Sequence, residues 1–203
     1  MNSQKYIIMT KNILCSLMLV ALLASCVRES VNDRQFIVSV GDRVDLNFEM
    51  DYFQMVLPEG ETDSKIVQGT VNLADYLGRV ILIQFTTFDC NMSFEKMTHI
   101  EPKIWQRHKE NPNFKLLGIA RRDENTVENV KDLIERTEVT YPIARDPEQT
   151  FFTRFAERNG GATRDILIGK DGRIVMLTRY FGRDGMAEFN ALVAKIDELL
   201  SDD

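Results

Sequence analysis

The chain has 203 residues, of which 44% are hydrophobic and 28% charged, with 11 Gly and 5 Pro. This composition allows a sizeable core and excludes a disordered or collagen-like chain. Acidic residues number 31 against 25 basic ones, for a formal net charge of -6, and this balance disfavours binding to a nucleic-acid backbone. We therefore expect no nucleic acid among the partners.

The N-terminus has the pattern of an export signal. A polar stretch with lysines and no acid precedes the apolar run Ile13–Ala24, which is too short for the roughly 20 residues of a membrane-spanning helix. The segment Leu23-Ala24-Ser25-Cys26 resembles the lipobox of bacterial lipoproteins, in which the cysteine is acylated and becomes the new N-terminus. The resemblance implies removal of residues 1–25 as a lipoprotein signal peptide and a lipid anchor on Cys26. The alternative is an ordinary secretory signal with a coincidental cysteine.

The three cysteines of the chain then have different fates. Cys15 leaves with the signal and Cys26 is used by the lipid, so Cys90 is the thiol that remains. No intramolecular disulfide can form in the mature chain. A single free thiol is unusual for a protein exported to an oxidising compartment, and the sequence therefore directs attention to Cys90.

The first elements of the mature chain are a tether and two strands. Residues 26–39 are predicted to be the lipid-anchored tether. Apolar residues then alternate with polar ones, which predicts a strand with one buried face: Val44, Leu46, Phe48 and Met50. Residues 51–79 contain Pro, Gly and polar residues and predict a loop or a hairpin. The nearly continuous apolar run Val80–Phe85 predicts a central strand that is covered on both faces.

Helical and strand patterns alternate after Cys90. Apolar residues at three- and four-residue spacings predict a helix, with a kink at Pro102: Met97, Ile100, Ile104 and Trp105. The remaining predicted elements are a strand at 114–120, a helix at 127–134, a strand at 141–144, a Phe-rich helix at 151–156, strands at 166–168 and 174–178, and a helix at 186–200. The pair Asp171-Gly172 marks a hairpin between the last two strands.

This order of elements predicts an α/β fold. Alternating strands and helices favour a mainly parallel central sheet that is covered on both faces, and the closing hairpin adds an antiparallel edge. We find no internal repeat and predict a single domain over residues 40–203.

Cys90 lies where a buried strand gives way to a helix. In open parallel sheets, ligands bind outside the carboxyl ends of the strands. The unpaired N–H groups and the positive end of the helix dipole favour a thiolate at this position, and the neighbouring Asp89 opposes the effect. We therefore expect moderate activation of the thiol.

The residues around Cys90 resemble the active-site region of the thioredoxin superfamily. The run Val80–Phe85 is followed by Thr86-Thr87-Phe88-Asp89-Cys90-Asn91-Met92-Ser93 and a helix. More narrowly, the chain is similar to TlpA-like membrane-tethered disulfide reductases and to AhpC/TSA-type proteins. The similarity extends over Val40-Gly41-Asp42, Ile104-Trp105, Phe114–Ala120 and the segment 166–174. It implies a thioredoxin-like central mixed β-sheet flanked by helices.

The chain departs from the Trp-Cys-x-x-Cys motif of that family at several positions. Asp89 replaces the tryptophan and Ser93 the second cysteine, while the proline that faces the active site corresponds to Thr163, ahead of Arg164. A dithiol reductase uses its second thiol to resolve the mixed disulfide, and Ser93 cannot perform this step. Its hydroxyl can still donate a hydrogen bond to the Cys90 thiolate. The resemblance therefore implies a monothiol oxidoreductase at the cell envelope, with protein or small-molecule thiols and disulfides as partners.

Two alternatives remain open at this stage. The first is a one-cysteine peroxidase, because Thr87 and Cys90 resemble the Thr-x-x-Cys half of the peroxiredoxin signature and Arg164 is a candidate for the cation of such a site. The second is a redox-inactive binding or scaffold protein that keeps the fold. We predict no cofactor and no metal, since His99 and His108 do not form a convincing ligand set with Cys90.

Overall fold

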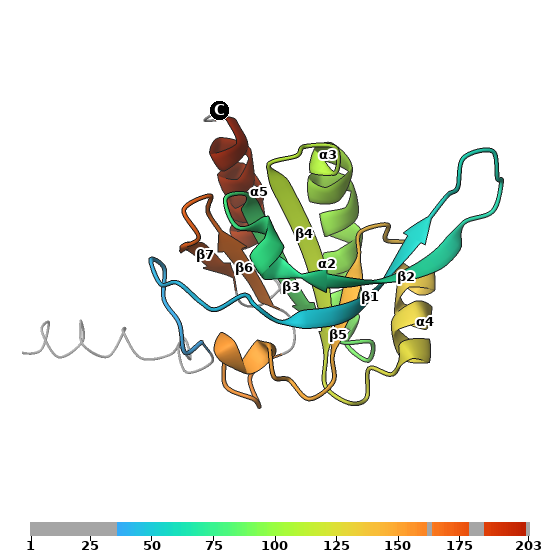
Figure 1. Ribbon diagram of the computed structural model, residues 1–203, viewed down its shortest axis with the longest axis horizontal. Helices are drawn as coiled ribbons and strands as arrows, with labels where there is room; N and C mark the ends of the chain where they lie inside the picture. The colour runs from blue at the N-terminus through green and yellow to red at the C-terminus, as the bar shows by residue number, and fades with distance from the viewer. Residues whose placement is uncertain (1–35, 162–163, 179–184, 202–203) are drawn as a thin grey trace, which may run out of the picture. The chain divides into compact units, whose positions relative to one another are not determined.

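In the computed structural model, the described residues are 36–161, 164–178 and 185–201. Seven strands form a sheet of order β2-β1-β5-β4-β3-β6-β7 (Figure 1). Their bounds are β1 Glu49–Val56, β2 Lys65–Asn72, β3 Val80–Thr86, β4 Phe114–Arg121, β5 Ile143–Asp146, β6 Arg164–Ile168 and β7 Ile174–Thr178. The helices are α2 Asn91–Ile100, α3 Gln106–His108, α4 Val127–Thr137 and α5 Gly185–Ser201.

The sheet is mixed, as the family resemblance implies. Strands β3, β4 and β5 are parallel and form its centre. Strand β6 pairs antiparallel with β3 and carries β7 as the predicted hairpin partner. The prediction of a mainly parallel sheet is wrong, because strands from the region 51–79 also join the sheet and pair antiparallel. The hairpin β1–β2 adds antiparallel strands at the β5 edge.

The two faces of the sheet are covered differently. The helices α2, α4 and α5 pack on one face, where they bury Met97, Leu133 and Ile196 against alternate residues of the strands. The opposite face is covered by the 3-10 turns η2 (Leu73–Tyr76) and η4 (Phe152–Arg154) and by extended chain. The Phe-rich helix predicted at 151–156 is thus only a single 3-10 turn. Its phenylalanines still pack around Phe85 of β3.

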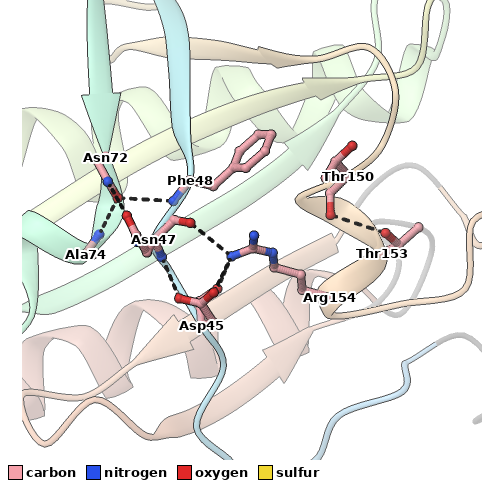
Figure 2. A network of polar contacts seen from close by, with 8 residues as sticks. All are labelled: Asp45, Asn47, Phe48, Asn72, Ala74, Thr150, Thr153 and Arg154. Carbon is pink, nitrogen blue, oxygen red and sulfur yellow. Dashed lines mark hydrogen bonds and ion pairs between the residues drawn. The ribbon is translucent and has the colours of Figure 1, made fainter.

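The first predicted strand begins later than the alternation indicates. Leu46 is buried as expected, but strand pairing begins only at Glu49. Side chains hold the preceding segment instead (Figure 2): Arg154 donates to the carbonyl of Asp45 at 2.7 Å, and Asn72 accepts from the Phe48 N–H at 3.2 Å. Asn72 also donates to the Asn47 side chain at 2.7 Å. These bonds fix the segment without a partner strand.

The remaining predicted elements differ from the structure mainly at their ends. The helix after Cys90 changes at Pro102 into a π-helical turn, Glu101–Trp105, since proline has no N–H to donate. Strand β5 begins at Ile143 and not at Tyr141. The first residues of the described chain, assigned above to the tether, contact the domain: Phe36 forms a β-bridge with Ala156.

Candidate active site

Cys90 is placed at the end of β3 and at the start of α2. Every residue of β3 is buried, so the strand is a rigid support for the loop that follows it. Cys90 is the N-cap residue of α2, with φ -116° and ψ 112°, and its carbonyl accepts the Phe94 N–H at 3.2 Å. Cys90 is partly exposed, and its side chain makes no hydrogen bond to the helix N–H groups. The helix therefore acts on the thiol through its field.

Ser93 follows Cys90 by one helical turn and is fully buried. Residues three apart lie on the same side of a helix, so Ser93 occupies the position where a second cysteine would approach the first. The deeper positions of this side are Lys96 and Met97, both buried against the sheet. Cys90 and Ser93 thus lie one turn apart on the same side of α2, and their roles as nucleophile and hydrogen-bonding neighbour stay a prediction.

The loop before Cys90 is fixed by hydrogen bonds. The Thr87 hydroxyl donates to Asp89 Oδ1 at 2.8 Å. Asn125, fully buried in the loop after β4, accepts the Phe88 N–H at 2.9 Å and donates to Thr87 Oγ1 at 3.4 Å. Thr87, Asp89 and Cys90 therefore lie together in this loop. Asn125 was not predicted, because it is one polar residue in a charged stretch.

A buried ion pair lies between α2 and the sheet. Lys96 Nζ lies 2.5 Å from Asp165 Oδ2 of β6, and the two side chains are 2% and 0% exposed. The Thr178 hydroxyl of β7 donates to the same carboxylate oxygen at 2.5 Å. The pair connects the helix that begins at Cys90 to two strands. Its signal in the sequence is a lysine four residues before Ile100, within the apolar stripe of the helix.

Further polar groups surround this ion pair. Gln84 of β3 is directly opposite Asp165 in the strand register, and its Oε1 accepts the Tyr141 hydroxyl at 3.0 Å. Burial raises the pKa of Tyr141 well above its ordinary value, and the negative charges of Glu101 and Asp165 act in the same direction. Among the described residues, Gln84 Nε2 and Asp165 Oδ1 have no hydrogen-bond partner. The core below the site is thus polar and only partly satisfied.

Arg164, predicted to be near Cys90, points to the other side of the sheet. It pairs with Phe85, which belongs to the face opposite α2. Its guanidinium donates to the Gly161 carbonyl at 2.8 Å and lies over the Phe36 ring at 4.7 Å. The structure therefore does not bring its charge to the helix side of Cys90. Thr163 and Cys26 lie outside the described residues.

The carboxyl ends of β4 and β5 carry two more buried charges. Arg121 donates to Gln149 Oε1 at 2.7 Å and to the Gly160 carbonyl. Burial lowers the pKa of Arg121 to about 10, and the positive charges of Arg122 and Arg164 act in the same direction. Burial raises the pKa of Asp146, although its carboxylate accepts the Phe152 N–H at 2.7 Å.

The described part of the chain contains no group of three or more His, Cys, Asp or Glu residues that could hold a metal ion. It also contains no helix of the length and apolarity that a membrane crossing requires.

The mixed sheet, with a helix that begins at a cysteine after its central strand, defines a thioredoxin-like fold. Solved structures agree. A candidate protein disulfide isomerase from Bacteroides thetaiotaomicron is 34% identical, with a TM-score of 0.67 over 83% of this chain and 94% of that one. A candidate thiol:disulfide interchange protein DsbE from Chlorobium tepidum is 17% identical, with a TM-score of 0.57 over 80% and 99%.

The family model described as AhpC/TSA matches residues 49–177, and the chain belongs to this family. The resemblance drawn from the residues around Cys90 is thereby confirmed at the level of family and fold. A search of curated proteins finds no match.

Proposed function

We propose that this protein is a thioredoxin-like oxidoreductase of the cell envelope that works through one cysteine and forms mixed disulfides. The observation that carries the proposal is the partly exposed Cys90 at the N-cap of α2, with Ser93 buried one turn later. The 34% identical relative is named as a candidate protein disulfide isomerase, which supports thiols and disulfides as the substrate class.

The proposed step is one thiol–disulfide exchange. The Cys90 thiolate attacks one sulfur of a substrate disulfide, the S–S bond of the substrate breaks, and a bond between Cys90 and the attacked sulfur forms. The other half of the substrate leaves as a thiolate and takes up a proton. Ser93 has no thiol with which to release the bound half, so turnover needs an external thiol.

The contacts of Thr87 and Arg164 favour this chemistry over reduction of a peroxide. A peroxidase of this type needs a threonine hydroxyl and a cation directed at the cysteine. Here the Thr87 hydroxyl donates to Asp89, and the Arg164 guanidinium donates to Gly161 on the other side of the sheet. Neither group supports peroxide binding at Cys90 in this arrangement.

The test uses the full chain with Cys15→Ser and Cys26→Ser, so that Cys90 is the remaining thiol. Bis(2-hydroxyethyl) disulfide should give one adduct on Cys90 by mass spectrometry, with no release until glutathione is added. Cys90→Ala should give none. Ser93→Cys should lose the adduct and form an internal disulfide instead, because the new thiol can attack Cys90. Absence of any adduct on Cys90 would leave the redox-inactive binding protein as the better description.

We also propose that Cys26 carries the lipid anchor that holds the domain at the extracytoplasmic side of the envelope. The support is the short apolar run followed by Leu23-Ala24-Ser25-Cys26. Metabolic labelling with an alkyne fatty acid should mark the wild-type protein and not Cys26→Ser. Equal labelling of both would contradict the anchor.

A further inference from the structure

The residue before the nucleophile is a fixed negative charge. Asp89 is exposed and directly precedes Cys90, with the two Cα atoms about 3.8 Å apart, so its carboxylate lies within the range over which it attracts or repels a charged group that approaches Cys90 at low ionic strength. The Thr87 hydroxyl donates to Asp89 Oδ1 at 2.8 Å. An exposed aspartate would otherwise sample several rotamers, and this bond limits them.

Thr87 is itself held in place from another segment. It is 3% exposed, and its oxygen accepts from the fully buried Asn125 at 3.4 Å. Asn125 also accepts the Phe88 N–H at 2.9 Å, so both residues before Asp89 are tied to the loop after β4. The position of the Asp89 carboxylate therefore follows from the fold.

The same loop adds charge of the same sign. Asp123 and Glu124 are exposed beside Asn125, and Arg122 is half-buried. The guanidinium of Arg164 is directed to the opposite face of the sheet. Arg145 of β5 donates to the Asn125 carbonyl at 2.8 Å, so a cation also contacts this loop. Among the described residues, Asp89 is the charged residue that is adjacent to Cys90 in the chain.

We propose that Asp89, positioned by Thr87 and Asn125, makes Cys90 selective for disulfides that carry positive charge next to the reacting sulfur. This inference rests on the proposed function, since it requires that Cys90 exchanges with disulfides. A cationic substituent is attracted to the carboxylate in the encounter and in the mixed disulfide, and an anionic one is repelled. At a separation of about 6 Å in water between the carboxylate and a unit charge on the substrate, their interaction changes the rate of exchange about threefold. The rates of a cationic and an anionic substrate should therefore differ about tenfold.

Three disulfides of similar size test the proposal: cystamine (cationic), bis(2-hydroxyethyl) disulfide (neutral) and 3,3′-dithiodipropionate (anionic). The second-order rate of adduct formation on Cys90 is measured in the full chain with Cys15→Ser and Cys26→Ser, at low ionic strength. The cystamine-to-dithiodipropionate rate ratio in the wild type, divided by the ratio in Asp89→Asn, removes the intrinsic reactivity of each reagent. We expect a quotient of about ten that decreases towards one in 1 M salt.

The matched control is Glu59→Gln. This change removes the same charge from the exposed turn of the β1–β2 hairpin, which lies at the strand ends away from Cys90. Glu59→Gln should have the same cystamine-to-dithiodipropionate rate ratio as the wild type. Thr87→Val should lower this rate ratio, because the Asp89 carboxylate loses its hydrogen-bond donor. Thr87→Ser keeps the hydroxyl and should retain the wild-type rate ratio. Circular dichroism establishes that each variant is folded.

The possible failures are distinguishable. If none of the three disulfides forms an adduct with Cys90, the proposed function is refuted. If all three react and Asp89→Asn has the same ratio as the wild type, the function stands and the charge selectivity is refuted. An unchanged ratio in Thr87→Val refutes the positioning role of Thr87.

Discussion

The buried pair of Lys96 and Asp165 makes the strongest prediction about stability. Lys96→Met removes the ammonium and leaves the Asp165 carboxylate in the core with the Thr178 hydroxyl as a hydrogen-bond donor. Asp165→Asn has the converse effect and leaves the ammonium without its counter-charge. Both side chains are almost completely withdrawn from water, so solvent cannot replace the lost partner.

The magnitude follows from that burial. Removing one member of a buried ion pair costs about 3–5 kcal/mol, which is a large part of the roughly 5–15 kcal/mol that stabilises a typical domain. For a domain of this size, the midpoint of thermal unfolding should decrease by about 6–20 °C. Replacing both residues by apolar ones, as in Lys96→Met with Asp165→Leu, leaves no buried charge and should cost much less than the two single changes together.

Urea unfolding of the wild type, the single variants Lys96→Met and Asp165→Leu, and their double variant measures the coupling. We expect a coupling energy of about 2–3 kcal/mol, because the residues are in direct contact. If the two single effects add within about 0.5 kcal/mol, or if each costs under about 1 kcal/mol, the pair does not function as a buried ion pair and the reasoning is refuted.

Two further predictions concern Asn125 and Asp146. Asn125→Ala leaves the Phe88 N–H without its acceptor and should lower the free energy of unfolding by about 1–3 kcal/mol. Hydrogen exchange of the peptide that contains Phe88 should accelerate. Unchanged exchange would contradict the role of Asn125. Burial raises the pKa of Asp146 above 3.8, so the folded state binds the proton more tightly than the unfolded state. The contribution of Asp146 to stability is therefore most favourable below the unfolded pKa and is lost as the pH rises through the folded pKa. The stability of the wild type relative to Asp146→Asn should decrease from pH 4 to pH 7 in denaturant titrations, and a constant difference would count against the burial of this charge.

The elements that could be predicted are those with a continuous pattern. The apolar runs of β3 and β4 and the Asp171-Gly172 turn each contain a local signal that tertiary contacts do not alter. Cys90 could be identified in the same way, because the change from strand to helix pattern places it at the edge of the sheet.

The hairpin that was one alternative for residues 51–79 is present as β1–β2, but the bounds of its strands could not be predicted, for a reason visible in the structure. Gly69 interrupts the pattern of β2, and it lies opposite Tyr52 in the register. A Cβ atom at Gly69 would lie 2.8 Å from the Tyr52 ring, so the glycine makes room for the aromatic side chain. A sequence pattern treats this glycine as a break, although the strand needs it for packing.

The buried polar residues were missed because each needs a distant partner. Lys96 and Asp165 are 69 residues apart in number, and neither is recognisable as buried until β6 lies beside β3. Asn125 likewise acquires its role only when the loop after β4 meets the loop after β3. Local periodicity contains no information on such pairs.

These polar contacts have a common consequence for the site. A buried ion pair adds little net stability compared with apolar residues of similar size, so hydrophobic packing has to hold the fold together. Lys96 and Asp165 instead connect the two elements: the Nζ–Oδ2 contact constrains how α2 lies against β6. Cys90 is the N-cap of that helix, and Asn125 fixes the loop on its other side. The thiol and the Asp89 carboxylate are therefore positioned by two independent polar contacts, and this is the geometry that charge-selective exchange requires.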